Sequence, residues 1–286
     1  MATIPSRVES RMVSAIKKFQ PILISSKTRD VNEPDTVRIV TDMLEEVFGY
    51  DKFSEVTAEH AIRGTFCDLA IKFDVTIQLL IEVKAIGIEL KDAHVKQAID
   101  YAANEGVDWV VLTNGVSWRV YKVIFGKPID HEIVYEIDFI NFDTKKDDQL
   151  ELLYVLTREG WVKSLLKELN EQRQALSKFI IAAVALSDPV VDAMRRELKR
   201  VCPNVKIQNE QIQQVLSEGV LKREVVEGEK ADEARKKVTR SANRKARLAT
   251  ASSAPSNQAA QPASAIPIAP AAPRATECAP DGEIPS

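Results

Sequence analysis

The stretch from Ile77 to Ala85, IQLLIEVKA, is the feature that most limits how this chain can fold. It is almost continuously apolar until Glu82 and Lys84 interrupt it, and such a run is typical of a β-strand buried on both faces. Because side chains alternate along a strand, Glu82 and Lys84 share one face of it. Charged side chains between such apolar flanks need a partner or a chemical purpose.

The preceding segment, Phe66 to Phe73, is predicted to be a neighbouring strand that carries an acid. Its alternation is expected to place Asp68 on one face and the following residues on the other: Cys67, Leu69, Ile71 and Phe73. If the two strands form a hairpin through residues 74–76, Asp68 and Glu82 can converge. Two adjacent carboxylates repel each other, and a divalent cation with hard oxygen ligands, Mg²⁺ or Mn²⁺, relieves that repulsion. Lys84 could orient a water that attacks phosphorus, or help to deprotonate it.

Each of these residues also has an ordinary structural explanation. A Glu-x-Lys triplet is common in strands, and a single Asp in a strand usually lies at the surface; the apolar flanks of Glu82 favour a chemical role. A following helix, 90–105, places Gln97 and Tyr101 four residues apart on one face. The pair could reach the mouth of the site, with Gln97 bonding a phosphate or a metal-bound water and Tyr101 fixing its position. Alternatively they are a surface amide and an aromatic at the edge of the core.

Periodicity and turn signals predict an α/β arrangement around these segments. Asn32-Glu33-Pro34-Asp35 has the composition of a helix start, and Gly49 is expected to end that helix. The remaining elements are listed by residue number: a helix at 6–24; strands at 53–62, 109–113, 117–125 and 131–137; turns at 63–65 and 114–115; and helices near 147–158, 161–185, 188–201 and 207–222.

The net charge of -3 conceals an uneven distribution. Residues 230–250 hold eight Lys or Arg and two acids (+6), residues 251–286 hold one Arg and three acids (-2), and the first 229 residues therefore sum to -7. So acidic a body does not attract DNA by its overall field. The basic segment is either a nucleic-acid arm or a solubilising linker. From about Ala249 the chain is rich in Ala, Pro and Ser, and a disordered tail is expected.

Other sequence features exclude several classes of protein. No apolar run approaches the roughly 18 residues that span a membrane, and the first residues lack the apolar stretch of a secretion signal. The three cysteines contain no CxxC pair, which indicates neither a disulfide framework nor a zinc site. We therefore expect a cytoplasmic protein without membrane contact.

The ordered set of Asp68, Glu82-Val83-Lys84 and Gln97-x-x-x-Tyr101 resembles the PD-(D/E)xK nuclease superfamily. More narrowly, NEPDTVRIVTDMLEEVFGYD, RGTFCDLAI, LLIEVKA, QAIDYA and VVLTNGVSWRVY look like the N-terminal nuclease domain of type I restriction enzyme R subunits. The resemblance implies a restriction-endonuclease-like core, with a central mixed β-sheet flanked by helices. It also implies that Asp68 and Glu82 hold Mg²⁺, that Lys84 activates water and that Gln97 joins the catalytic set. Glu33 matches an acid that can complete such a site, although an acid at a helix start has its own electrostatic explanation.

R subunits continue into an ATP-driven motor, but this sequence has no G-x-x-x-x-G-K-[ST] loop, so we expect neither ATP hydrolysis nor DNA translocation. We predict a Mg²⁺-dependent DNA endonuclease of the restriction–modification type at residues 30–140, after an N-terminal helical segment (1–29). A helical extension (141–229) and a tail (230–286) follow. The alternative is a catalytically silent module that binds nucleic acid or protein. A specificity or motor protein could be a partner, and the C-terminal helices could form a homo-oligomer.

Overall fold

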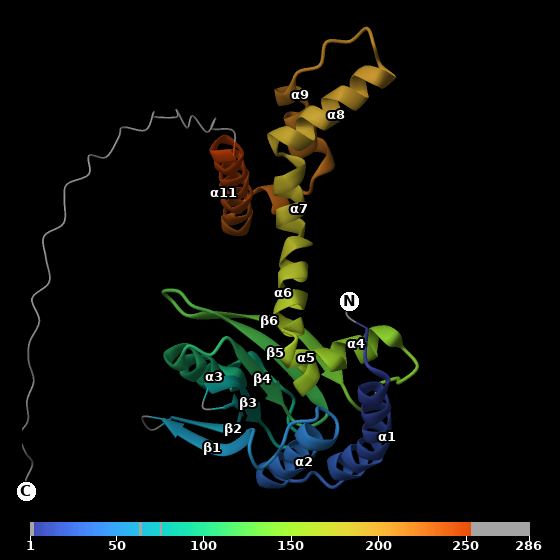
Figure 1. Cartoon of the computed structure of the whole chain (residues 1–286), viewed down its shortest axis with the longest axis vertical. Helices are drawn as coiled ribbons and strands as arrows, with labels where there is room; N and C mark the ends of the chain where they lie inside the picture. The colour runs from blue at the N-terminus through green and yellow to red at the C-terminus, as the bar shows by residue number, and fades with distance from the viewer. Residues whose placement is uncertain (1–2, 63–64, 75, 253–286) are drawn as a thin grey trace, which may run out of the picture.

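The computed structural model describes residues 3–62, 65–74 and 76–252. Figure 1 shows an α/β core from which two helices, α6 (Leu165–Ala175) and α7 (Lys178–Ala185), rise as a stalk to a smaller helical head. The predicted tail beyond residue 252, and residues 63 and 64 of the predicted turn, lie outside the described residues.

The core is built on one mixed sheet of six strands in sequence order. The strands are β1 (Val56–Ile62), β2 (Thr65–Phe73), β3 (Thr76–Val83), β4 (Trp109–Thr113), β5 (Ser117–Ile124) and β6 (Asp130–Asp138). Strands β3 and β4 are parallel, because helix α3 (Asp92–Glu105) carries the chain back between them, and the other neighbours are antiparallel. The predicted mixed sheet flanked by helices is confirmed.

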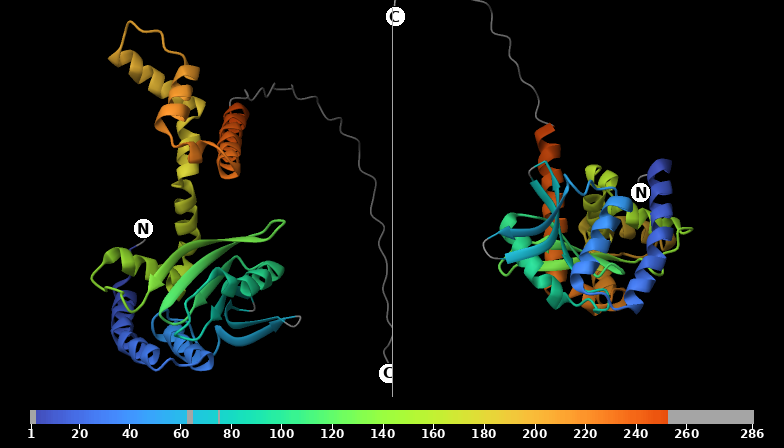
Figure 2. Two further views of the ribbon diagram at one scale, coloured as in Figure 1. Left: turned by 180° about the vertical axis from the view of Figure 1, so that it is seen from behind. Right: turned by 90° about the horizontal axis from the view of Figure 1, so that it is seen from below.

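Both faces of the sheet are covered by helices (Figures 1 and 2). On one face, α1 (Ser6–Thr28), α2 (Glu33–Glu46) and α4 (Asp147–Leu156) share a hydrophobic core with the sheet, and α3 covers the other face. Strand β3 contributes Leu79 and Ile81 to the first core and Leu80 to the second. The prediction that this strand is buried on both faces is therefore confirmed.

The helices that flank the site begin and end at the predicted signals. Asn32 caps α2, because its Oδ1 accepts a hydrogen bond from the backbone N–H of Asp35 at 3.0 Å, and Pro34 lies in the first turn. Gly106 ends α3 with φ of 70°, a conformation that favours glycine. These local contacts fix where the two helices start and stop beside β3.

Two sequence expectations were wrong. Cys67 does not share a face with Leu69, because its thiol donates to the carbonyl oxygen of Ile81 at 3.2 Å and packs in the core beneath α3. The single helix expected at 161–185 is divided into α5 (Arg158–Val162), α6 and α7. Ser164 separates the first two with φ of 59°, and the Ser177 hydroxyl caps the third by accepting the N–H of Ile180.

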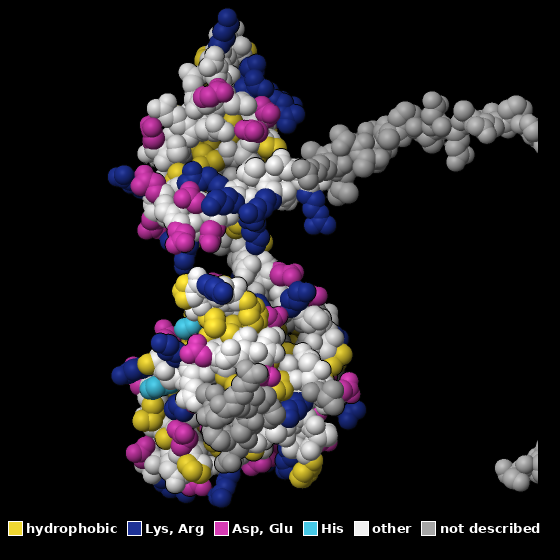
Figure 3. All heavy atoms as spheres, turned by 90° about the vertical axis from the view of Figure 1, so that its left-hand side faces the viewer, with side chains coloured by type: hydrophobic (Ala, Val, Ile, Leu, Met, Phe, Trp, Pro, Cys, Tyr) yellow, Lys and Arg dark blue, Asp and Glu magenta, His cyan; other side chains and the backbone are white. Residues whose placement is uncertain are grey.

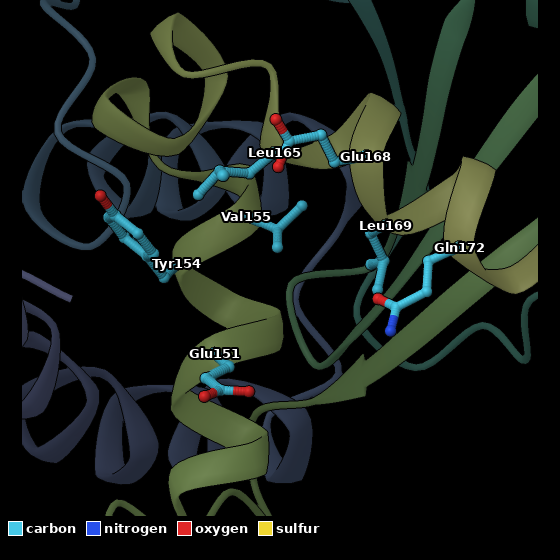
Figure 4. Close-up of a pocket in the computed structure, with 7 residues that line it drawn as sticks. All are labelled: Glu151, Tyr154, Val155, Leu165, Glu168, Leu169 and Gln172. Carbon is cyan, nitrogen blue, oxygen red and sulfur yellow. The ribbon is translucent and has the colours of Figure 1, made fainter. Parts of the chain in front are cut away.

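The base of the stalk is packed against the core. A cavity of about 60 Å³ lies between α4 and α6 (Figure 4), and seven residues line it: Glu151, Tyr154, Val155, Leu165, Glu168, Leu169 and Gln172. Lys163, just before α6, donates a hydrogen bond to the Tyr154 hydroxyl at 3.0 Å. Leucines of α6 belong to the same hydrophobic core as the sheet, so the lower stalk is anchored.

The head contains α8 (Asp188–Val201), α9 (Asn209–Val215), a π-helical turn η1 (Leu216–Val220), α10 (Arg223–Val226) and α11 (Glu229–Ser252). The helix expected at 207–222 is thus interrupted, and most of the basic segment assigned to the tail forms α11 instead. An apolar groove of about 590 Å³ lies between α8 and α9. Among the described residues, no helix combines the length and the apolar character needed to cross a bilayer.

An aromatic cluster inside the core provides a test of the packing. Phe139 is fully buried and stacks near Phe48, Trp118 and Phe142, with ring centroids 5.8–6.1 Å away. Phe139→Ala should lower the free energy of unfolding by about 3–5 kcal/mol, since it leaves a cavity. Phe53 is 87% exposed, and Phe53→Ala should change it by no more than about 0.5 kcal/mol. Equal losses in urea unfolding would contradict the fold.

Candidate functional site

Asp68 and Glu82 lie opposite each other on neighbouring strands. Leu69 of β2 pairs with Ile81 of β3, so the next residues outward are these two acids. Directly opposed residues of an antiparallel pair project from the same face of a sheet. Asp68 is half-buried and Glu82 is only 8% exposed. Asp68 is oriented by the backbone N–H of Val83, which donates to its Oδ2 at 2.7 Å.

Lys84 completes a compact charged cluster just beyond the end of β3. Its Nζ lies 2.6 Å from Oε1 of Glu82 and 3.7 Å from Oε2 of Glu33, which the first turn of α2 supplies. Its backbone N–H donates to the carbonyl oxygen of Thr113 at 2.8 Å, which fixes the chain to the neighbouring strand. The structure therefore brings together Asp68, Glu82 and Lys84, and adds Glu33 at their edge.

The electrostatics of the cluster follow from its burial and its excess of acids. Burial raises the pKa of Glu82, the charge of Asp68 raises it further, and the hydrogen bond from Lys84 offsets only part of the effect. Burial alone would lower the pKa of Lys84, but its hydrogen bond to Glu82 and the nearby carboxylates outweigh burial and raise this pKa. Lys84 is accordingly an ammonium ion, suited to orient a water or a phosphate oxygen.

Cys67 lies beside the two acids but is not a nucleophile. Its side chain is fully buried, and burial, reinforced by the charges of Glu82 and Asp68, raises the thiol pKa to about 12. Since the thiolate is the reactive form of cysteine, a thiol with such a pKa is inert near neutral pH. The expectation that Cys67 packs in the core is confirmed.

Gln97 and Tyr101 occupy different environments on α3. Tyr101 is 3% exposed, and its buried hydroxyl has no hydrogen-bond partner among the described residues. Burial raises its pKa, as do the charges of Glu105 and Cys67. Gln97 is exposed, and within the described part of the chain no hydrogen bond joins it to Tyr101 or to the acids. The expected positioning of Gln97 by Tyr101 is absent from this arrangement, and the catalytic role of Gln97 stays a prediction.

Two polar residues that the sequence did not single out hold the segment that follows Lys84. The Thr36 hydroxyl accepts the backbone N–H of Ile86 at 3.1 Å and donates to the carbonyl oxygen of Asn32 at 2.8 Å. The Asn114 amide donates to the carbonyl oxygen of Ile88 at 2.9 Å. Both residues were interpreted only as local helix and turn residues, because spacing alone does not reveal contacts with a distant segment.

A second pair of contacts anchors the start of α3 to β5. Arg119 Nη1 donates to the carbonyl oxygen of Leu90 at 2.7 Å, and the Tyr121 hydroxyl donates to Oδ1 of Asp92 at 3.3 Å. These residues belong to the VSWRVY segment that carried part of the family resemblance. They are positioning residues, since they touch the backbone and the helix start and not the acids.

The oxygen atoms available at the site suit a hard divalent cation. Asp68 accepts a hydrogen bond through Oδ2 and Glu82 through Oε1, while their other carboxylate oxygens accept none from the described residues. Across the described ranges, no group of three or more His, Cys, Asp or Glu side chains is placed to hold a metal ion. Mg²⁺ keeps several waters and uses one or two protein carboxylates, so a two-carboxylate site fits that ion.

Comparison with known families identifies the segment that carries these residues. Residues 38–137 match the family model of the type I restriction enzyme R protein N terminus. The resemblance inferred from the sequence motifs is thereby confirmed for about a third of the chain. The match spans the five residues from Asp68 to Tyr101 discussed above and begins after Glu33. Searches of curated proteins and of solved structures each found no match.

The electrostatic coupling predicts how Glu82 titrates. In ¹³C NMR of carboxyl-labelled protein, Glu82 should titrate above an ordinary glutamate. Asp68→Asn should lower the Glu82 pKa by removing a like charge, and Lys84→Gln should raise it by removing a cation. Because the folded state binds this proton more tightly, the stabilisation is present below the unfolded pKa and is lost as pH rises through the folded pKa. Shifts of the opposite sign would contradict the described contacts.

Proposed function

We propose that the α/β core is a metal-dependent DNA endonuclease that hydrolyses phosphodiester bonds. The observation that carries the proposal is the placement of Asp68 opposite Glu82, with the Lys84 ammonium against Glu82. This trio lies within the segment that matches the restriction-enzyme family, which supports a restriction-related, nuclease-like function. In the reaction, water adds to phosphorus, one ester P–O bond breaks, and the products are a phosphate end and a hydroxyl end.

Each residue of the cluster has a distinct role in this proposal. Asp68 and Glu82 would hold Mg²⁺ or Mn²⁺ through the oxygens left after their hydrogen bonds to Val83 and Lys84. When bound, the ion supplies a polarised water and neutralises charge on the phosphate oxygens. Lys84, kept protonated by its acidic neighbours, orients the attacking water or the scissile phosphate. Glu33 holds the Lys84 ammonium from the side of α2.

The excess of acids explains why the proposed activity needs a cation. Three carboxylates surround one ammonium ion, and two of them lie in a partly buried position. A phosphodiester approaching this cluster is repelled unless positive charge is added. Gln97, exposed on α3, is free to hydrogen-bond a phosphate or an ordered water, and Tyr101 would line the floor below it.

Target selection is a separate matter. We propose that a specificity or motor protein could bring this core to its DNA. Homo-oligomer formation through the C-terminal helices stays a prediction, which light scattering on the full chain would test.

Isosteric substitutions at the cluster test catalysis. Asp68→Asn, Glu82→Gln and Lys84→Gln should each reduce Mg²⁺-dependent nicking of a supercoiled plasmid by at least about 100-fold, because each removes a charge that acts on the reacting groups. EDTA should abolish the activity of the unsubstituted protein.

The matched control is Asp74→Asn at the tip of the same hairpin. Asp74 is exposed with φ of 55°, a conformation that asparagine tolerates, so nicking should be unchanged. If all three site variants nick DNA as fast as this control, the nuclease proposal is wrong. Absence of nicking by the unsubstituted protein, with duplex binding retained, would favour the catalytically silent module.

Cation binding can be measured without any reaction. Mn²⁺ or Mg²⁺ at 100 times its Kd should stabilise the folded core by about 2.7 kcal/mol, provided that the unfolded chain does not bind the ion. The stabilisation should vanish in Asp68→Asn and persist in Asp74→Asn, as followed by urea unfolding with and without the ion. Equal stabilisation of both variants would place the ion elsewhere.

A further inference from the structure

Helix α11 has one face fixed to the head and another free. Ala231 and Ala234 are buried and Val238 is half-buried on the side that packs against α7. Arg235 ties the helix to α10, because its Nη2 donates to the carbonyl oxygen of Val226 at 2.6 Å, and it also pairs with Asp232 at 3.0 Å. The helix is therefore held in a defined orientation.

The opposite face carries a basic ridge, defined here as Lys236, Lys237, Arg240 and Arg244. All four side chains are exposed, and none has an ion-pair partner among the described residues. At 3.6 residues per turn they fall within an arc of about 100° and span about 12 Å along the axis. The acids of α11 all precede residue 234. Figure 3, viewed from the α11 side, shows Lys and Arg side chains gathered on this part of the head.

The ridge supplies the local positive charge that the rest of the chain lacks. The first 229 residues sum to -7, so a polyanion is repelled by the body as a whole. Since the four cations of the ridge have no acidic partners to release, they can bind phosphates without breaking ion pairs. Their span of about 12 Å is close to the width of the major groove of B-DNA, so the ends of the ridge can reach phosphates on both sides of it.

The construction of α11 favours a nucleic acid over a lipid surface. A membrane-bound amphipathic helix needs large apolar side chains on an exposed face. The apolar side of α11 consists of small residues that already pack on α7. We propose that the basic ridge of α11 binds the phosphate backbone of duplex DNA without sequence preference. The choice of DNA rests on the proposed nuclease function of the core, because the head lies on the same chain as the acidic cluster.

The test uses the full chain, a fluorescent 30-base-pair duplex and EDTA, so that binding is measured without cleavage. Replacing all four ridge residues with Gln should weaken binding by at least about tenfold near 0.1 M salt. The slope of log binding constant against log salt should fall in magnitude by about 3 to 4, since each phosphate contact contributes about 0.9. Circular dichroism should show an unchanged helix content, because the packed face of α11 is untouched.

The matched control removes the same charge elsewhere. Arg7, Lys17, Lys145 and Lys146 are exposed and unpaired within the described residues, at α1 and before α4, and their replacement by Gln should leave the slope unchanged. Equal slopes in the two variants would overturn the proposal. So would loss of binding to phosphatidylglycerol vesicles, with DNA binding intact, in the ridge variant. These outcomes are independent of nicking by Asp68→Asn, which tests the nuclease itself.

Discussion

The antiparallel register between β2 and β3 is the constraint on which the candidate site depends. Pairing of Leu69 with Ile81 sets Asp68 opposite Glu82, and a shift by one residue would turn one acid to the other face of the sheet. The hydrogen bond from the Val83 N–H to Asp68 ties an acid to the backbone of the partner strand at 2.7 Å. Hydrophobic cores on both faces hold this register, so the acids remain together despite their mutual repulsion.

Much of the core could be predicted because its signals are local. The apolar run of β3, the cap at Asn32 and the stop at Gly106 each act within a few residues. The cluster could be predicted as well, since alternation and a short hairpin are enough to bring Asp68 and Glu82 together. The contact of Glu33 with Lys84 was anticipated only through the family resemblance, because helix and strand are about 50 residues apart.

What sequence reasoning missed depends on long-range contacts. Cys67 breaks the alternation because its thiol bonds to a carbonyl of the next strand. The long C-terminal helix is divided at Ser164 and Ser177, and neither serine differs in type from those found inside helices. The basic segment becomes a helix because Ala231 and Ala234 find a surface on α7. That surface exists only once the head has folded.

The narrow connection through α6 and α7 has a consequence for cooperativity. The buried residues of the head, among them Val191, Ile212 and Ala231, belong to neither of the two hydrophobic clusters of the core. Two packed units linked by a stalk need not melt together, and all-or-none behaviour is expected only of single domains. A calorimetric trace of the whole chain is then the sum of two transitions, of which an ion at the acidic cluster can displace only the one that belongs to the sheet.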